Sequence, residues 1–171
     1  MALLAEATQG RQRRRAPAAL LAALGLGTAG AGHAQVDEHA LKAAFVYNIA
    51  AFADWGGAPD QAVILCVQTG PQLDAALAAM AGRTFAGRRV EIARTPPAAG
   101  CDVLVQDAQL PPPAPAARLV ICDACQLPDG SSTVALVREG NRIRFDVDAA
   151  RARADGVTLS SQLLRLARRV L

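Results

Sequence analysis

Residues 62–82 read AVILCVQTGPQLDAALAAMAG, and this stretch decides the fold class. Its first six residues are apolar and partly β-branched, which is typical of a short buried strand. Leu73, Leu77 and Met80 then recur at three- and four-residue steps, a spacing that predicts a helix over residues 71–81. A buried strand followed at once by a helix is the unit that builds a parallel sheet with helices on its faces.

The same alternation continues on both sides of this stretch. Upstream, residues 37–55 predict a helix with Asp37 as its N-cap. Downstream, short apolar strands are expected at residues 89–93, 101–105 and 119–122. The apolar periodicity of the first helix comes from Leu41, Ala44, Phe45, Asn48, Ile49, Phe52 and Trp55.

The C-terminal third predicts a hairpin and a last helix. Residues 132–137 and 142–147 flank a turn-rich link, and residues 158–171 form a helical pattern that Ser160 or Ser161 would cap. The intervening segment of four prolines, residues 109–117, predicts a surface crossover. We therefore expect a single α/β domain: a mostly parallel mixed sheet flanked by helices, with a C-terminal β-hairpin and a closing helix.

The N-terminal 34 residues have the order of a secretory signal peptide. Four arginines at positions 11, 13, 14 and 15 precede an uncharged segment, residues 16–31, which ends on Gly32-His33-Ala34. We expect a signal peptide over residues 1–34, a mature domain over residues 35–171 and export from the cytoplasm. An uncleaved anchor is one alternative, although the apolar run is shorter than the roughly 20 residues of a membrane span. Export by a twin-arginine route, from Arg14-Arg15, is another.

Removal of this segment changes the charge of the protein. The chain has 18 basic and 15 acidic residues, but the mature domain has 14 of each. It shows no basic stripe interleaved with aromatic residues. The sequence therefore does not favour nucleic acid as a partner.

All four cysteines, Cys66, Cys101, Cys122 and Cys125, lie in the mature domain. An even number of cysteines in an exported chain indicates two disulfides. We expect Cys66 to pair with Cys101, because both lie in strands that should be near neighbours in one sheet, and Cys122 to pair with Cys125. A zinc site and a redox-active Cys122–Cys125 pair are the alternatives. The residues after Cys125 break a helix, however, whereas a redox thiol of that kind starts one.

The mature domain lacks the sequence patterns of an enzyme. His39 is its one histidine, and no Gly-x-Ser-x-Gly elbow or phosphate loop occurs. Asp146 and Asp148 would share one face of a strand, where paired carboxylates can act as acid and base, but a solvated strand face explains them more simply. We expect a non-catalytic binding protein with no cofactor and no metal.

Several segments together resemble the YfiR-like family of periplasmic regulators. The resemblance covers residues 38–170 in order. It rests on residues 41–50 (LKAAFVYNIA) followed by Phe52 and Trp55, on residues 65–67 (LCV), 101–104 (CDVL) and 142–147 (RIRFDV), and on residues 156–167 (GVTLSSQLLRLA).

This resemblance implies a function that the residue patterns alone do not show. It implies a periplasmic protein that binds the sensor domain of an inner-membrane diguanylate cyclase and holds it inactive, which limits cyclic di-GMP and biofilm formation. The close spacing of Cys122 and Cys125 departs from the family pattern. A different membrane sensor, such as a histidine kinase, is therefore one alternative, and a periplasmic small-molecule binder is another. An exposed patch beside the hairpin would favour a protein partner, and a deep enclosed pocket would favour a small molecule.

We expect the partner-binding surface at the hairpin and the start of the last helix. Arg138, Glu139, Arg142 and Arg144 surround the projecting turn there, and loops on a rigid scaffold often carry binding residues. An ordinary solvated hairpin is the alternative, and the sequence leaves a homodimer open.

Overall fold

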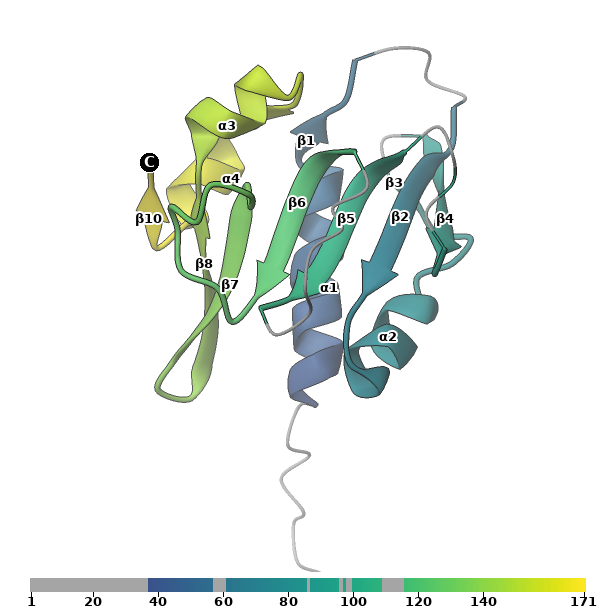
Figure 1. The fold of residues 1–171 in the computed structure, drawn as a ribbon, viewed down its shortest axis with the longest axis horizontal. Helices are drawn as coiled ribbons and strands as arrows, with labels where there is room; N and C mark the ends of the chain where they lie inside the picture. The colour runs from purple at the N-terminus through teal and green to yellow at the C-terminus, as the bar shows by residue number, and fades with distance from the viewer. Residues whose placement is uncertain (1–36, 57–60, 86, 96, 98–99, 109–115) are drawn as a thin grey trace, which may run out of the picture. The chain divides into compact units, whose positions relative to one another are not determined.

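The computed structural model describes residues 37–171 except 57–60, 86, 96, 98–99 and 109–115 (Figure 1). The predicted signal peptide, the start of the mature domain at Gln35 and most of the proline-rich crossover lie outside the described residues.

A mixed sheet forms the centre of the described domain, with strand order β10-β8-β7-β6-β5-β2-β4-β3. Strands β4, β2, β5, β6 and β7 run parallel to one another, whereas β3 pairs antiparallel with β4, and β7 and β8 form an antiparallel hairpin. The predicted mostly parallel sheet with a hairpin is therefore confirmed. The strands are β2 (Val63–Gln68), β3 (Thr84–Phe85), β4 (Arg88–Ala93), β5 (Cys101–Asp107), β6 (Ala117–Asp123), β7 (Val134–Glu139), β8 (Arg142–Val147) and β10 (Arg169–Val170).

Four helices accompany this sheet in the described residues. They are α1 (Glu38–Ala51), α2 (Pro71–Ala78), α3 (Ala149–Ala154) and α4 (Ser161–Leu166). Helix α1 crosses behind the sheet in Figure 1. Its predicted N-cap is confirmed, since the Asp37 carboxylate accepts a hydrogen bond of 3.0 Å from the backbone N–H of His39.

The main core lies between α1, α2 and one face of the sheet. Val46 and Ile49 of α1 are fully buried against alternate residues of the strands, such as Leu65 and Ile121. Each such side chain contributes about 1.5–3 kcal/mol by leaving water. The opposite face of the sheet holds a smaller buried cluster of Cys66, Cys101, Leu104 and Val120.

The first helix ends four residues earlier than the sequence predicts. Ala53 and Asp54 leave α1 to form strand β1 (Ala53–Asp54), which pairs antiparallel with β9 (Thr158–Leu159). Trp55 is buried beyond the helix, where its indole N–H donates to the carbonyl of Ala50 at 3.0 Å. Phe52, predicted on the apolar face, is exposed.

The closing helix is also shorter than predicted. Helix α4 is capped by Ser160, whose hydroxyl accepts from the N–H of Leu163 at 3.2 Å, and it spans six residues. The chain then turns into β10, which pairs parallel with β8 at Asp146 and Val147. The predicted hairpin therefore has a further strand beside it and is not the edge of the sheet.

The reading of Asp146 and Asp148 as a solvated pair is wrong. Asp146 is fully buried in β8. The Asp148 carboxylate accepts a hydrogen bond of 2.8 Å from the N–H of Arg151 and caps α3, a helix that the sequence analysis did not predict. The two carboxylates therefore have separate structural roles.

Candidate partner-binding site

The charged residues of the hairpin divide between its two faces. In the β7–β8 ladder, Glu139 lies opposite Arg142 and Val137 lies opposite Arg144. Cross-strand partners, and residues two apart on one strand, point to the same side. Glu139, Arg142 and Arg144 therefore share one face, which we call the β8 face. Arg138 points to the other face, on which α1 packs.

Arg138 forms an ion pair with the first helix. Its guanidinium lies 2.6 Å from the carboxylate of Glu38. Lys42 Nζ in turn lies 3.0 Å from Glu38 and 2.8 Å from Asp123. These four side chains link the hairpin, α1 and the end of β6, so Arg138 helps to hold the hairpin in place.

The charge state of this network follows from its hydrogen bonds. The bond from Lys42 is the main cause that holds the pKa of Glu38 below its usual value. Burial opposes the charge on Lys42, but its hydrogen bonds with Asp123 and Glu38 outweigh that effect and raise the pKa of the ammonium. Both groups are therefore charged at neutral pH. The sequence analysis missed this network, although the Glu38–Lys42 spacing of four residues on a helix was a signal for one of its pairs.

An open hollow of about 730 Å³ lies between the start of α1 and the hairpin. The apolar side chains of Leu41 and Ile143 form part of its lining. Several other lining residues are exposed, so the hollow opens to solvent. The polar lining residues are Asp37, Glu38, His39, Arg138, Asn141 and Arg142.

The β8 face is rich in arginine. Within the described part of the chain, Arg142 and Arg144 form no side-chain hydrogen bond or ion pair. Further along β8, Asp146 accepts two hydrogen bonds from Arg168, at 2.8 and 2.6 Å, and lies 3.1 Å from Arg169. The bonds from Arg168 are the main cause that lowers the pKa of Asp146, against the opposing effect of burial. This side of the hairpin therefore carries more arginines than carboxylates.

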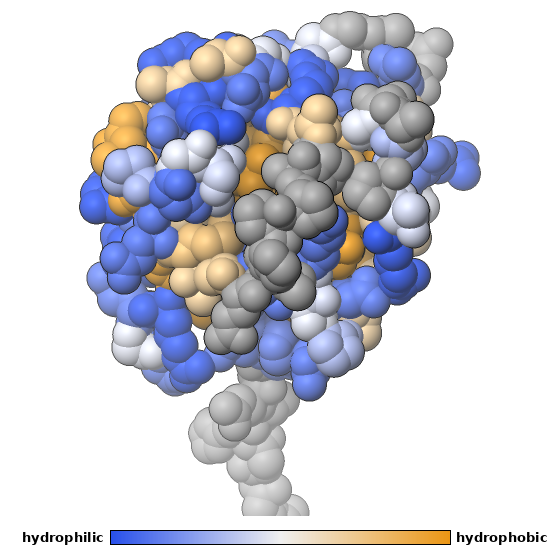
Figure 2. All heavy atoms as spheres, in the orientation of Figure 1, coloured by the Kyte–Doolittle hydropathy of each residue, from blue (hydrophilic) through white to orange (hydrophobic). Residues whose placement is uncertain are grey.

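Three exposed apolar side chains lie at the C-terminal end of the chain. Leu166, Val170 and Leu171, which we call the C-terminal apolar group, are 62%, 46% and 41% exposed. Val170 belongs to β10, which pairs directly with β8. Figure 2 shows a surface that is largely hydrophilic, with smaller apolar patches between the charged residues. Val170 lies opposite Val147, which is buried on the α1 side of the sheet, so Val170 points away from the β8 face. The β8 face is therefore a mainly charged surface, and the C-terminal apolar group is a separate exposed feature.

Both predicted disulfide pairings are present. Cys66 of β2 bonds to Cys101 of β5, with a Cα–Cα distance of 5.9 Å, and these strands are neighbours in the sheet. The bridge closes the chain between residues 35 positions apart. It therefore ties two central strands together on the face opposite α1.

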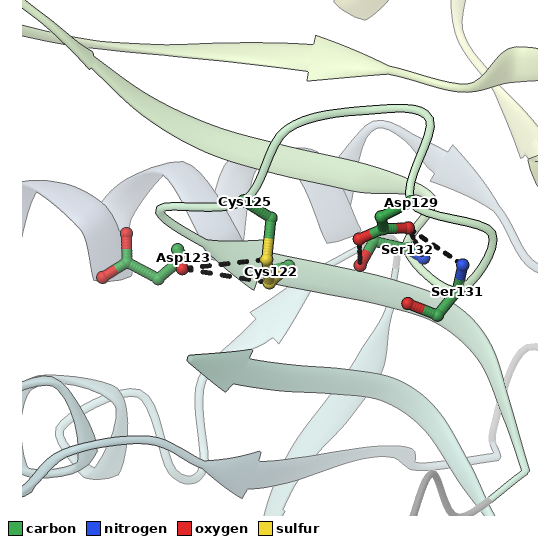
Figure 3. The surroundings of a disulfide bond; sticks show 6 residues. All are labelled: Cys122, Asp123, Cys125, Asp129, Ser131 and Ser132. Carbon is green, nitrogen blue, oxygen red and sulfur yellow. Dashed lines mark hydrogen bonds between the residues drawn. A yellow bond between two sulfur atoms is a disulfide. The ribbon is translucent and has the colours of Figure 1, made fainter. Parts of the chain in front are cut away.

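The second disulfide lies where β6 ends (Figure 3). Cys122 and Cys125 flank a turn in which Ala124 has a φ of 61°. The carboxylate of Asp129 closes the following loop by accepting hydrogen bonds from Ser131 and from Ser132. Burial opposes the charge on Asp129, but these bonds outweigh it and lower its pKa. No helix begins at Cys122, so the helix N-terminus that activates a redox thiol is missing from this segment.

The comparisons with known proteins identify a family. The family model described as YfiR/HmsC-like matches residues 39–168, more than half of the chain. Members of this family are regulatory rather than catalytic proteins and act in the periplasm. A comparison with curated proteins gave no match. Among the described helices, none has the length and apolar character needed to cross a membrane. The match includes all of α1 but its first residue, both disulfides, the whole hairpin and Asp146, and the chain therefore belongs to the YfiR/HmsC-like family.

Proposed function

We propose that this protein is a periplasmic regulator that binds and represses a membrane-anchored diguanylate cyclase, and so limits cyclic di-GMP and biofilm formation. Membership of the YfiR/HmsC-like family supports the regulatory role in the periplasm. The observation that carries the proposal is the arginine-rich β8 face, on which Arg142 and Arg144 have no partner in the described chain.

The composition of this surface defines the partner that it fits. Arg142 and Arg144 have no intramolecular carboxylate to satisfy them in the described chain, so an acidic segment of a sensor domain would complement them. The C-terminal apolar group is exposed around β10, the strand that pairs with the end of β8, and is a second candidate for apolar contact with a partner. Arg138 contributes indirectly, because its bond to Glu38 fixes the hairpin against α1.

Binding to the purified periplasmic domain of a membrane-anchored diguanylate cyclase from the same organism tests the proposal. The double charge reversal Arg142→Glu and Arg144→Glu should weaken binding by at least about tenfold, mainly through slower association at low salt. The matched control is Arg89→Glu with Arg153→Glu, which changes the net charge equally at two exposed arginines outside the β8 face. Equal binding by the two double variants would place the interface elsewhere.

A deletion strain tests the signalling role. Loss of the protein should raise cyclic di-GMP and surface attachment, and only the wild-type gene, not the Arg142/Arg144 variant, should restore both. Unchanged nucleotide levels after deletion would point to another membrane sensor, for which a histidine kinase is the second candidate.

A further inference from the structure

A second cavity, of about 490 Å³, lies at the amino ends of the parallel strands, away from the hairpin tip. The start of β5, with Cys101 and Asp102, and the start of β6, with Arg118, form part of its wall. Its size falls within the range of roughly 300–1,000 Å³ that is typical of small-molecule sites. The cavity is also lined by two residues of β4, Arg88 and Glu91, and by Gln61, which precedes β2.

Arg88 is a buried cation without a carboxylate partner. The residue is 6% exposed, and no carboxylate of the described chain lies within ion-pair distance of it. Its Nε donates to the carbonyl of Gln61 at 2.8 Å and its Nη1 to the carbonyl of Gly56 at 3.4 Å. Buried charges are usually paired, because an uncompensated charge away from water is costly.

The remaining nitrogen of Arg88 is open to the cavity. Nη2 has no hydrogen-bond partner in the described residues. No described side-chain nitrogen or oxygen is both fully buried and without a partner. Nη2 is therefore not fully buried, and since Arg88 lines the cavity, we infer that the unbonded edge of its guanidinium faces that space.

Arg118 places a second guanidinium near the first. Its Nη2 donates to the carbonyls of Trp55 and Gly156, and its guanidinium carbon lies 5.6 Å from the centre of the Trp55 ring. Arg88 and Arg118 therefore bond to the carbonyls of adjacent residues, Trp55 and Gly56. These contacts hold both side chains in position before any ligand binds.

Among the described residues, no carboxylate around the cavity pairs with Arg88. Asp102 lies 3.7 Å from Arg118 and accepts a hydrogen bond of 2.9 Å from the N–H of Ile64. Asp155 is paired with Arg151 at 3.2 Å. Glu91 is exposed and makes no ion pair in the described chain, so it adds a negative charge at the solvent side.

We propose that this cavity binds a small molecule through a carboxylate or phosphate group held on the free edge of the Arg88 guanidinium. A planar guanidinium suits both groups, because it offers parallel N–H donors. The site is distinct from the β8 face, so its ligand could be bound while the protein holds its partner.

Titration of the exported protein, purified from the periplasm, tests this site without any partner present. Inorganic phosphate and succinate serve as separate probes in calorimetry and thermal denaturation, with sodium chloride added to match ionic strength. We expect saturable binding of at least one probe and a matching rise in melting temperature. Binding of both probes would mean a general oxyanion site, and binding of one would assign the group.

Three variants locate the binding. Arg88→Gln should weaken it by about tenfold or more, because it removes the charged donor. Arg89→Gln, at the exposed neighbour on the same strand, should leave the affinity within about twofold. Glu91→Gln should strengthen binding by about twofold, because it removes a repelling charge at the rim. Equal affinities of Arg88→Gln and the wild type would overturn the proposal, as would the absence of saturable binding in the wild type.

Amide chemical shifts of the wild-type protein report binding without the need for a folded variant. Phosphate added to the wild type should shift the resonances of Ile64, Cys101 and Asp102 and leave those of the hairpin unchanged. The reverse pattern would contradict the assignment to this cavity.

Discussion

Lys42 Nζ lies 2.8 Å from the carboxylate of Asp123, so the first helix is tied directly to the end of strand β6. Both side chains are mostly buried. Asp123 directly follows Cys122 of the second disulfide, and Lys42 also binds Glu38, the partner of Arg138. One ammonium group thus connects three parts of the chain that are far apart in sequence.

Breaking this pair should destabilise the fold. Lys42→Met and Asp123→Asn should each lower the free energy of unfolding by about 1–3 kcal/mol. The first leaves the largely buried Asp123 without its partner, and the second leaves Lys42 with Glu38 alone. Urea denaturation of the single and double variants gives the coupling energy, which we expect to exceed about 1 kcal/mol. The exposed Arg94–Asp74 pair is the matched control, with an expected coupling below about 0.5 kcal/mol. Similar couplings in the two cycles would contradict the structural role of Lys42.

Asp146 should make the protein less stable in acid. Its folded-state pKa is lowered, mainly by the hydrogen bonds from Arg168. As the pH falls below about 5, the unfolded state therefore takes up a proton at this carboxyl group before the folded state does. The stability that the ionised carboxylate contributes is lost as the pH falls further, through the folded-state pKa. We expect urea denaturation at pH 7 and pH 3 to show this loss in the wild type.

The variant Asp146→Asn separates this effect from that of other carboxyl groups. It should be less stable at pH 7 by roughly 2–3 kcal/mol, because Arg168 and Arg169 lose a charged acceptor. It should also lose less stability on acidification than the wild type. Glu38 and Asp129, whose pKa values are also lowered, should account for part of the remaining pH dependence. An unchanged difference between pH 7 and pH 3 would show that Asp146 does not drive the acid response.

The two disulfides should contribute unequally to stability. The Cys66–Cys101 bridge spans 35 positions, which by the chain-entropy estimate stabilises the fold by roughly 3–4 kcal/mol. Cys122–Cys125 spans three positions, for which the same estimate is about 1.5–2 kcal/mol. Thermal denaturation should therefore show a larger fall in melting temperature for Cys66→Ser with Cys101→Ser than for Cys122→Ser with Cys125→Ser. Non-reducing peptide mapping checks the pairing, and a Cys66–Cys122 peptide would refute it.

The exported protein should begin at Gln35. The basic cluster, the uncharged run and the Gly32-His33-Ala34 ending predict cleavage after Ala34. N-terminal sequencing of protein from the periplasmic fraction checks this. An intact Met1 on protein from the cytoplasm would be inconsistent with export.

The candidate site was predictable only in part. Charged residues around a Gly-Asn turn mark a projecting hairpin, and strand alternation could have separated Arg138 from Arg142 and Arg144. The bond from Arg138 to Glu38 spans 100 positions, however, and depends on how α1 packs against the sheet. The burial of Arg88 could not be predicted either, because an arginine at the start of a strand is normally exposed to solvent.

The sequence by itself determined the elements that depend on local periodicity and composition. These include the strand and helix of residues 62–82, the hairpin of residues 132–147 and the pairing of Cys66 with Cys101, since side-chain spacing dictates which face each element buries. The tertiary structure alone decided where the first and last helices stop. Ala53 and Leu159 leave a helical pattern to pair with each other, and the ion pairs of Arg168 and Arg169 with the buried Asp146 accompany the extended strand beside β8. Helical periodicity shows that a segment prefers to form a helix, but this preference is weak at the ends of the segment. There, hydrogen bonds and ion pairs with distant parts of the chain outweigh it.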